Sequence, residues 1–85
     1  MYRIEFTRQA AKALIKAPVA TARRIRAKLD VLAKAPFLAY ADVKKLAGRS
    51  GYRLRLGDWR VIYEIDNGQL ILLVIDLGTR GDIYK

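Results

Sequence analysis

The chain begins with an alternation of apolar and charged residues. Tyr2, Ile4 and Phe6 are separated by Arg3 and Glu5. Successive side chains of a strand point to opposite faces, so one face of this segment would be buried and the other exposed. This segment is therefore predicted to form a short strand.

A helical repeat follows the strand. Thr7 is a favourable N-cap residue, and Pro18 either ends this helix or starts the next. Apolar residues between them recur at helical spacing, at Ala10, Ala13, Leu14 and Ala17. A second apolar stripe before Pro36 comprises Ala22, Ile25, Leu29 and Leu32. Two helices joined so tightly are expected to form an antiparallel hairpin.

Residues 37–51 are interpreted as a basic connector between the helices and the rest of the chain. Its apolar residues Val43 and Leu46 are expected to point inward. Its cations are expected to stay in solvent as candidate RNA contacts, namely Lys44, Lys45 and Arg49. Such residues more often serve solubility than binding, and the same holds for the basic flanks of the helices.

Three further strands are predicted, over residues 52–56, 59–65 and 70–77. Gly57-Asp58 suits a two-residue turn of type II′, and Asn67-Gly68 suits a type I′ turn. The apolar face of the first two strands carries Tyr52, Trp59 and Tyr63, which we interpret as core residues and not as platforms for stacking bases.

The predicted order is strand, helix, helix and three strands. It indicates an α+β fold in which a helical hairpin lies beside a three-stranded antiparallel meander. With 85 residues, the chain is expected to form a single domain over residues 1–85.

The charge of the chain gives information about its binding partner. The formal net charge is +9, and it is unevenly placed. Residues 1–50 hold twelve Lys and Arg against three acids, whereas residues 51–85 hold five of each sign. Such an excess favours a polyanionic partner, nucleic acid first and an anionic membrane second.

Two residue types that often carry chemistry are missing. The chain has no cysteine and no histidine, and its eight carboxylates show no metal-ligand spacing. A site without metal or cofactor is therefore expected. The first ten residues lack the apolar stretch of a signal peptide, and the most apolar run, residues 70–75, is too short to cross a bilayer. A cytoplasmic location is expected, with no membrane partner.

The turns set a register for the basic residues. With Gly57-Asp58 as the loop, Arg55 faces Arg60 and Arg53 faces Ile62. With Asn67-Gly68 as the second loop, Arg60 faces Ile75. The end of the last strand then returns to the same end of the sheet. The residues expected to converge there are Arg53, Arg55, Arg60, Arg80 and Tyr84.

Several guanidinium groups around one surface suit a phosphate, because the planar fork of arginine binds phosphate oxygens in a bidentate manner. Directly opposed like charges also destabilise a sheet, so stability alone would not favour the Arg55/Arg60 pair. The simpler alternative is a solvated outer face of an ordinary antiparallel sheet. Tyr84 taken alone is more often a terminal packing residue than an acid or a base.

Longer motifs in which these residues lie show a family resemblance. The stretch GYRLRLGDWRVIYEID and the later LGTRGDIYK resemble the RelE/ParE superfamily of bacterial toxins, and YRIEFTRQAAKALIK and DVKKLAG fit as well. The resemblance covers nearly the whole chain. It implies an antiparallel sheet beside a helical hairpin, and a type II toxin–antitoxin pair in which a cognate antitoxin wraps over the toxin.

The resemblance also implies an activity. RelE-like members cleave mRNA at the ribosomal A site, and their cleavage positions match Arg53, Arg55, Arg60, Arg80 and Tyr84. Some relatives have lysine at the first two of these positions. Because arginine does not release a proton, this departure places more weight on Tyr84 as proton acceptor. The ParE-like branch shares the fold, lacks the basic set and poisons gyrase.

We therefore expect an endoribonuclease with mRNA, the ribosome and an antitoxin as partners. The 2′-hydroxyl of the RNA would attack the adjacent phosphorus and leave a 2′,3′-cyclic phosphate and a 5′-hydroxyl end. A gyrase inhibitor and a non-catalytic protein that binds RNA or an antitoxin remain as alternatives.

Overall fold

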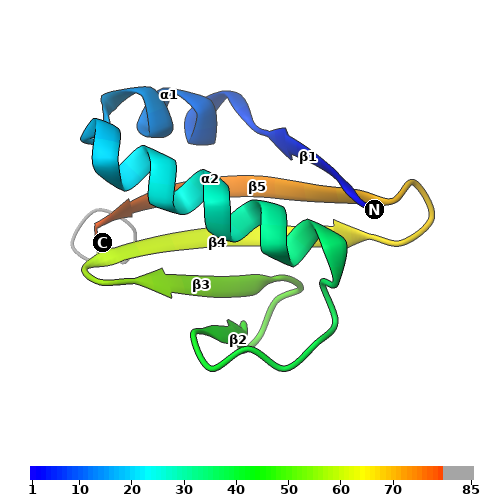
Figure 1. Cartoon of the computed structure of the whole chain (residues 1–85). Helices are drawn as coiled ribbons and strands as arrows, with labels where there is room; N and C mark the ends of the chain where they lie inside the picture. The colour runs from blue at the N-terminus through cyan, green and yellow to red at the C-terminus, as the bar shows by residue number, and fades with distance from the viewer. Residues whose placement is uncertain (80–85) are drawn as a thin grey trace.

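The molecule has two layers, with two helices packed on one face of a five-stranded sheet (Figure 1). The computed structural model describes residues 1–79. The helices are α1 (Arg8–Lys16) and α2 (Val19–Lys34). The strands are β1 (Arg3–Phe6), β2 (Val43–Lys45), β3 (Tyr52–Leu56), β4 (Trp59–Asp66) and β5 (Ile71–Thr79). The α+β class and the helical hairpin are as predicted.

The sheet has the strand order β1-β5-β4-β3-β2. The meander of β3, β4 and β5 is antiparallel, as predicted, and β1 adds to it by pairing in parallel with β5. The connector also contains a strand that was not predicted. Residues Val43–Lys45 form β2, an antiparallel edge strand on β3. The interpretation of 37–51 as a connector without a strand was therefore wrong at these three residues.

Thr7 ties the start of α1 to the sheet. Its Oγ1 accepts a hydrogen bond from the backbone N–H of Ala10 at 3.2 Å, which confirms the predicted N-cap. The same hydroxyl donates to the carbonyl oxygen of Ile75 on β5 at 2.6 Å. Pro18 lies between the helices and serves as the N-cap position of α2.

The core lies between the helices and the sheet. Ile25, Leu29 and Leu32 of α2 are fully buried, as the apolar stripe predicted. They belong to one cluster with residues of β3, β4 and β5, namely Leu54, Val61, Tyr63, Leu72, Val74 and Leu77. Tyr52 and Trp59 pack against this cluster, which confirms their interpretation as core residues.

One predicted turn is correct and the other is wrong. Gly57 has a φ of 58° and Leu56 pairs with Trp59, in agreement with a two-residue turn. The β4–β5 connection instead spans residues 67–70, because Asp66 pairs with Ile71. The carboxylate of Asp66 accepts a hydrogen bond from the backbone N–H of Gln69 at 3.0 Å, which stabilises this longer turn.

A β-bulge adds to the difference. The register between β4 and β5 shifts between Ile62 and Tyr63, so that Ile62 pairs with Asp76. Arg60 consequently faces Gly78. The predicted pairing of Arg60 with Ile75 was therefore wrong. Neither described helix is long and apolar enough to span a membrane.

Candidate nucleic-acid interface

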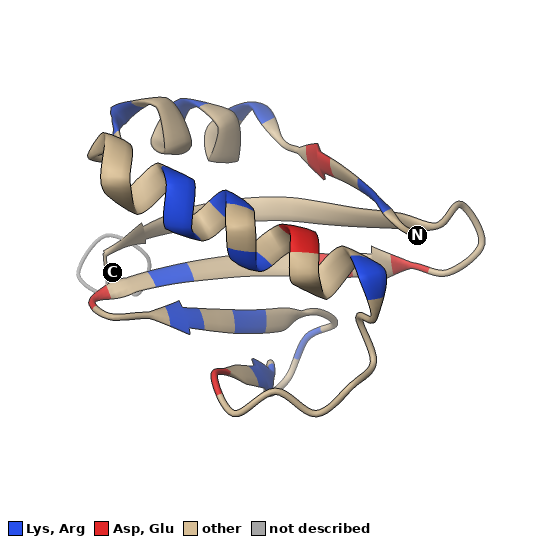
Figure 2. Cartoon of the chain, in the orientation of Figure 1, with Lys and Arg blue, Asp and Glu red and all other residues tan. Residues whose placement is uncertain are grey.

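The β3–β4 hairpin brings three arginines together on the face of the sheet that points away from the helices. Arg55 pairs with Arg60 and Arg53 with Ile62, the register predicted from the Gly57-Asp58 turn. The alternate residues of the same strands face the core. Figure 2 shows the basic positions of β3 beside that of β4, near the hairpin turn.

Arg60 is held by the backbone of the hairpin turn. One terminal nitrogen of its guanidinium donates to the carbonyl oxygens of Gly57 at 3.0 Å and Trp59 at 3.2 Å. Arg60 is only 9% exposed, an unusual state for a cation. Among residues 1–79 the ion pairs are Arg3–Glu5 and Lys28–Asp42, and neither involves Arg60. Its charge is therefore fixed in place and not neutralised by a described carboxylate.

Arg55 and Arg53 flank Arg60 with different exposure. Arg55 is exposed and Arg53 is half-buried. The backbone N–H of Arg55 donates to the carbonyl oxygen of Asp42 at 2.8 Å, which anchors this end of β3 to the segment that leads into β2. The opposition of Arg55 and Arg60 costs a few tenths of a kcal/mol or more. The stability of the sheet alone therefore does not account for two like charges there.

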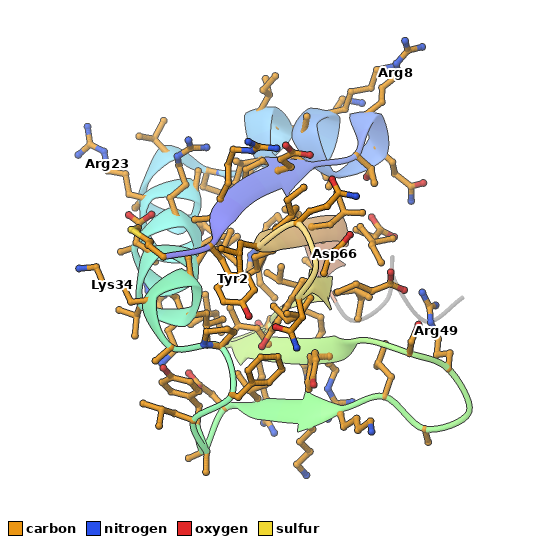
Figure 3. The ribbon with its side chains drawn as sticks, turned by 90° about the vertical axis from the view of Figure 1, so that its right-hand side faces the viewer. Tyr2, Arg8, Arg23, Lys34, Arg49 and Asp66 are labelled. Atoms are coloured by element: carbon orange, nitrogen blue, oxygen red, sulfur yellow. The ribbon has the colours of Figure 1, made fainter. Side chains whose placement is uncertain are left out.

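The three cations of the connector have different positions because of the unpredicted strand β2. Lys44 pairs with Arg53 and so joins the arginine face, whereas Lys45 pairs with Tyr52 and lies on the opposite side. Arg49 extends from the loop between β2 and β3, at the other end of β3 from the hairpin turn (Figure 3). We call Lys44, Arg53, Arg55 and Arg60 the basic face. The structure thus brings one of the three predicted RNA contacts to this face.

Two predicted site residues, Arg80 and Tyr84, lie outside the described residues. Their roles stay predictions. The convergence of Arg53, Arg55 and Arg60 is a property of the hairpin alone and does not depend on them.

Asp76 also lies on this side of the sheet, and it was missed from the sequence. It pairs with Ile62, which in turn pairs with Arg53, so these three residues form a row across β5, β4 and β3. Its carboxylate accepts a hydrogen bond from the backbone N–H of Leu77 at 2.9 Å. Only the register of β4 with β5 reveals this position, and the predicted register was shifted.

Tyr63 is excluded as a proton acceptor for this site. It is fully buried on the helix side of the sheet, where its ring stacks on that of Tyr52 with centroids 5.4 Å apart. Burial, with smaller contributions from Tyr52 and other nearby groups, raises the pKa of Tyr63 well above its usual value. The phenolate that could take a proton is therefore disfavoured.

The described residues contain no group of three or more His, Cys, Asp or Glu side chains placed to hold a metal ion. What the basic face offers is preorganised positive charge. Arginine forks bind phosphate oxygens, and fixed charge stabilises a phosphorane-like transition state more than the ground-state diester.

Comparison with known proteins bears on the family and the fold of the chain. Residues 4–84 match the family model described as the ParE toxin of the type II toxin–antitoxin system parDE. The chain is 37% identical to the toxin in a RelE–RelB complex from Pyrococcus horikoshii OT3, with 94% of this chain and 96% of that chain covered and a TM-score of 0.80.

Two structures from E. coli share the fold. The isolated RelE toxin is 24% identical over 99% of this chain and 92% of its own, with a TM-score of 0.82. The toxin–antitoxin complex RelBE gives 23% identity, coverage of 93% and 96%, and a TM-score of 0.81. A search of curated protein sequences found no match.

Proposed function

The chain belongs to the ParE toxin family within the RelE/ParE superfamily, and we propose that it acts as an endoribonuclease that cleaves mRNA at the ribosomal A site. The observation that carries the proposal is the basic face. Arg60 holds a charge that no described carboxylate neutralises, directly opposite Arg55 and diagonal to Arg53. This arrangement suits a phosphodiester, and the direct opposition of Arg55 and Arg60 does not favour the stability of the sheet.

The proposed reaction uses the RNA as its own nucleophile. The 2′-oxygen forms a bond to the adjacent phosphorus while the bond from phosphorus to the 5′-oxygen breaks. The 2′-proton passes to a base, for which Tyr84 is the candidate, and the departing 5′-oxygen takes up a proton. The products are a 2′,3′-cyclic phosphate and a 5′-hydroxyl end, and the route itself requires no metal.

The arginines have separate proposed roles in the reaction. Arg60, with Arg80, would hold the scissile phosphate and stabilise the charge that develops on its oxygens. Arg53 and Arg55 would bind the backbone of the RNA and assist the leaving oxygen. Without histidine the acid–base power of the chain is weak. Alignment of the mRNA by the ribosome therefore supplies a large part of the rate enhancement.

The helix layer provides a second docking surface. Figure 3 shows Arg23 and Lys34 extending from α2 away from the sheet, and Arg24 and Arg26 of the same helix are also exposed. We propose that this side binds ribosomal RNA. The similar RelE from Pyrococcus horikoshii is in complex with RelB, so a small antitoxin that covers the basic residues is the proposed protein partner.

The second candidate function is inhibition of gyrase. It is favoured by one observation, the match of residues 4–84 to a model named for the toxin of parDE. The 37% identity to a RelE toxin and the basic face favour RNA cleavage over it.

A translating extract tests the two functions together. Added protein should produce new mRNA ends that carry a 5′-hydroxyl. Arg60→Ala should reduce their formation by about 10²–10³-fold, the usual loss for one electrostatic contact to a transition state. Arg3→Ala is the matched control, because this arginine lies on the same sheet but is already paired with Glu5 at 2.8 Å.

Two outcomes would contradict the proposal. Intact mRNA together with trapped gyrase–DNA breaks would favour the second candidate. Equal cleavage by wild type and Arg60→Ala would show that the basic face does not carry the reaction.

A further inference from the structure

The face of the sheet away from the helices has two chemically different parts. The basic face covers β2, β3 and the start of β4, whereas β5 contributes an acid, Asp76. Ile62 lies between Arg53 and Asp76 in the same row and is only 6% exposed. A carboxylate therefore lies beside the cations, with an apolar side chain between them.

The bulge in β5 is what puts the carboxylate there. The pairing of Asp66 with Ile71, continued without a shift, would place Ile75 opposite Ile62. The extra residue places Asp76 there instead. The bulged segment is held from its other edge, because the backbone N–H of Thr7 donates to Val74 at 2.9 Å and its hydroxyl to Ile75 at 2.6 Å. Bulges commonly redirect a side chain next to a functional site.

The carboxylate of Asp76 has unused capacity. Within residues 1–79 it accepts one hydrogen bond, from the N–H of Leu77 at 2.9 Å, whereas a carboxylate can accept about four. Neither ion pair of residues 1–79 includes it, although Arg60 is its diagonal neighbour on β4. The guanidinium of Arg60 is engaged at the hairpin turn, away from Asp76. A half-buried acceptor thus remains for a ligand.

Spacing relates this acceptor to the proposed substrate. Neighbouring strands lie about 4.8 Å apart, so the backbones of Arg53 and Asp76 are separated by about 10 Å across β4. This separation is on the scale of one nucleotide, from its phosphate to the edge of its base. Sequence-specific proteins read unstacked RNA bases on such edges by hydrogen bonding.

We infer that Asp76 reads the base of a nucleotide whose phosphate is held on the basic face, and that this base is guanine. The inference rests on the proposed function and adds a specificity residue to it. Guanine presents two adjacent donors, N1–H and N2–H, which match the two oxygens of a carboxylate. Adenine and cytosine present one donor beside an acceptor, and uracil one donor between two carbonyl oxygens, so each places a lone pair against the carboxylate.

Mapping the cut sites of wild type and Asp76→Asn in the translating extract tests the inference. Wild type should cut with guanine enriched at one fixed position relative to the scissile bond. An amide accepts one hydrogen bond and donates another, which fits adenine as well as the N1–H and O6 of guanine. Asp76→Asn should therefore lower the ratio of guanine to adenine at that position by about tenfold, as expected for loss of a bidentate base contact.

Control variants separate base reading from a structural role. Glu5→Gln changes a carboxylate of the same sheet that is paired with Arg3, and should leave the preference unchanged. Asp76→Ala should remove the guanine preference without creating one for adenine. The total number of cuts should fall less than in Arg60→Ala, because the phosphate contacts remain.

The possible failures are distinguishable. Wild-type protein that cuts no RNA overturns the proposed function, and the role of Asp76 falls with it. Wild-type protein that cuts without a guanine preference, or Asp76→Asn that cuts with the wild-type preference, overturns the role of Asp76 alone. Equal melting temperatures of the variants would assign a changed preference to the contact and not to the fold.

Discussion

Arg60 and Tyr63 of β4 both bury a polar group, and they differ in whether that group is hydrogen-bonded. The guanidinium of Arg60 donates to two backbone carbonyl oxygens on the open side of the sheet. The hydroxyl of Tyr63 is buried on the helix side and has no hydrogen-bond partner among residues 1–79. An unpaired buried hydroxyl destabilises a fold, so the ring of Tyr63 contributes by packing and not through its oxygen.

Tyr63→Phe should therefore be neutral or stabilising, by up to about 1 kcal/mol in the free energy of unfolding. Urea denaturation measures this change. Tyr2→Phe is the control, because the hydroxyl of Tyr2 binds Asn67 Oδ1 and its removal should destabilise. A loss of stability in Tyr63→Phe larger than in Tyr2→Phe would contradict the assignment of an unpaired hydroxyl.

The raised pKa of Tyr63 gives the same variant a pH dependence. The hydroxyl stays protonated in the folded protein at a pH where the unfolded chain ionises, near pH 10. Its contribution is complete below that pH and is lost as the pH rises further. Wild type should lose stability above about pH 10 more steeply than Tyr63→Phe. Parallel pH profiles in urea would show that burial does not act on this group.

At the scale of elements, local signals predicted local structure. The Gly57-Asp58 turn and the alternation around Arg55 and Arg60 set the register of the β3–β4 hairpin correctly, because its two strands are joined by two residues. The apolar stripe of α2 could likewise be recognised from the sequence of that helix alone. For the basic residues of this hairpin, the sequence alone was therefore sufficient to predict the register.

The elements that were missed depend on contacts between distant segments. Strand β2 has three residues without a clear alternation, and it exists because β3 offers an edge for it. The bulge that exposes Asp76 is held by Thr7, which lies 68 residues away from Ile75. No pattern within β5 indicates this contact, so the position of Asp76 could not be predicted from the sequence.

The β4–β5 turn offers a test of why its prediction failed. Leu70 has a φ of 57°, a left-handed conformation that costs a residue with a side chain about 1–2 kcal/mol. It is 50% exposed, so its side chain contributes little to the core. Leu70→Gly should stabilise the protein by about 1 kcal/mol in urea denaturation.

Gln69→Gly is the control for that change. Its φ is not positive, so glycine there should only increase the freedom of the unfolded chain and destabilise by about 0.4–1 kcal/mol. If both variants lost stability to the same extent, the four-residue turn with left-handed Leu70 would be wrong, and a turn centred on Asn67-Gly68 would regain support.

At the scale of the whole molecule, two opposite surfaces carry groups of basic residues. One is the exposed side of α2, with Arg23 and Lys34 pointing away from the sheet (Figure 3). The other is the basic face on the far side of the sheet, as the strand pairing and the core residues indicate. A layer of apolar core separates them. Under the proposed function, one surface would contact ribosomal RNA and the other the message.

The edge strand β2 allows this division of charge to be measured with two adjacent residues. Lys44 lies beside Arg53 on the basic face, and Lys45 lies beside Tyr52 on the opposite side, although both are exposed. Binding of short single-stranded RNA should weaken with salt, and each phosphate neutralised contributes about −0.7 to the log–log slope. Lys44→Ala should make this slope shallower by about 0.7, whereas Lys45→Ala should leave it unchanged.

Because the two variants have equal net charge, any difference between them reports position on the molecule and not total charge. Equal slopes would mean that RNA is attracted by the whole charge of the chain, and that the basic face does not select where it binds.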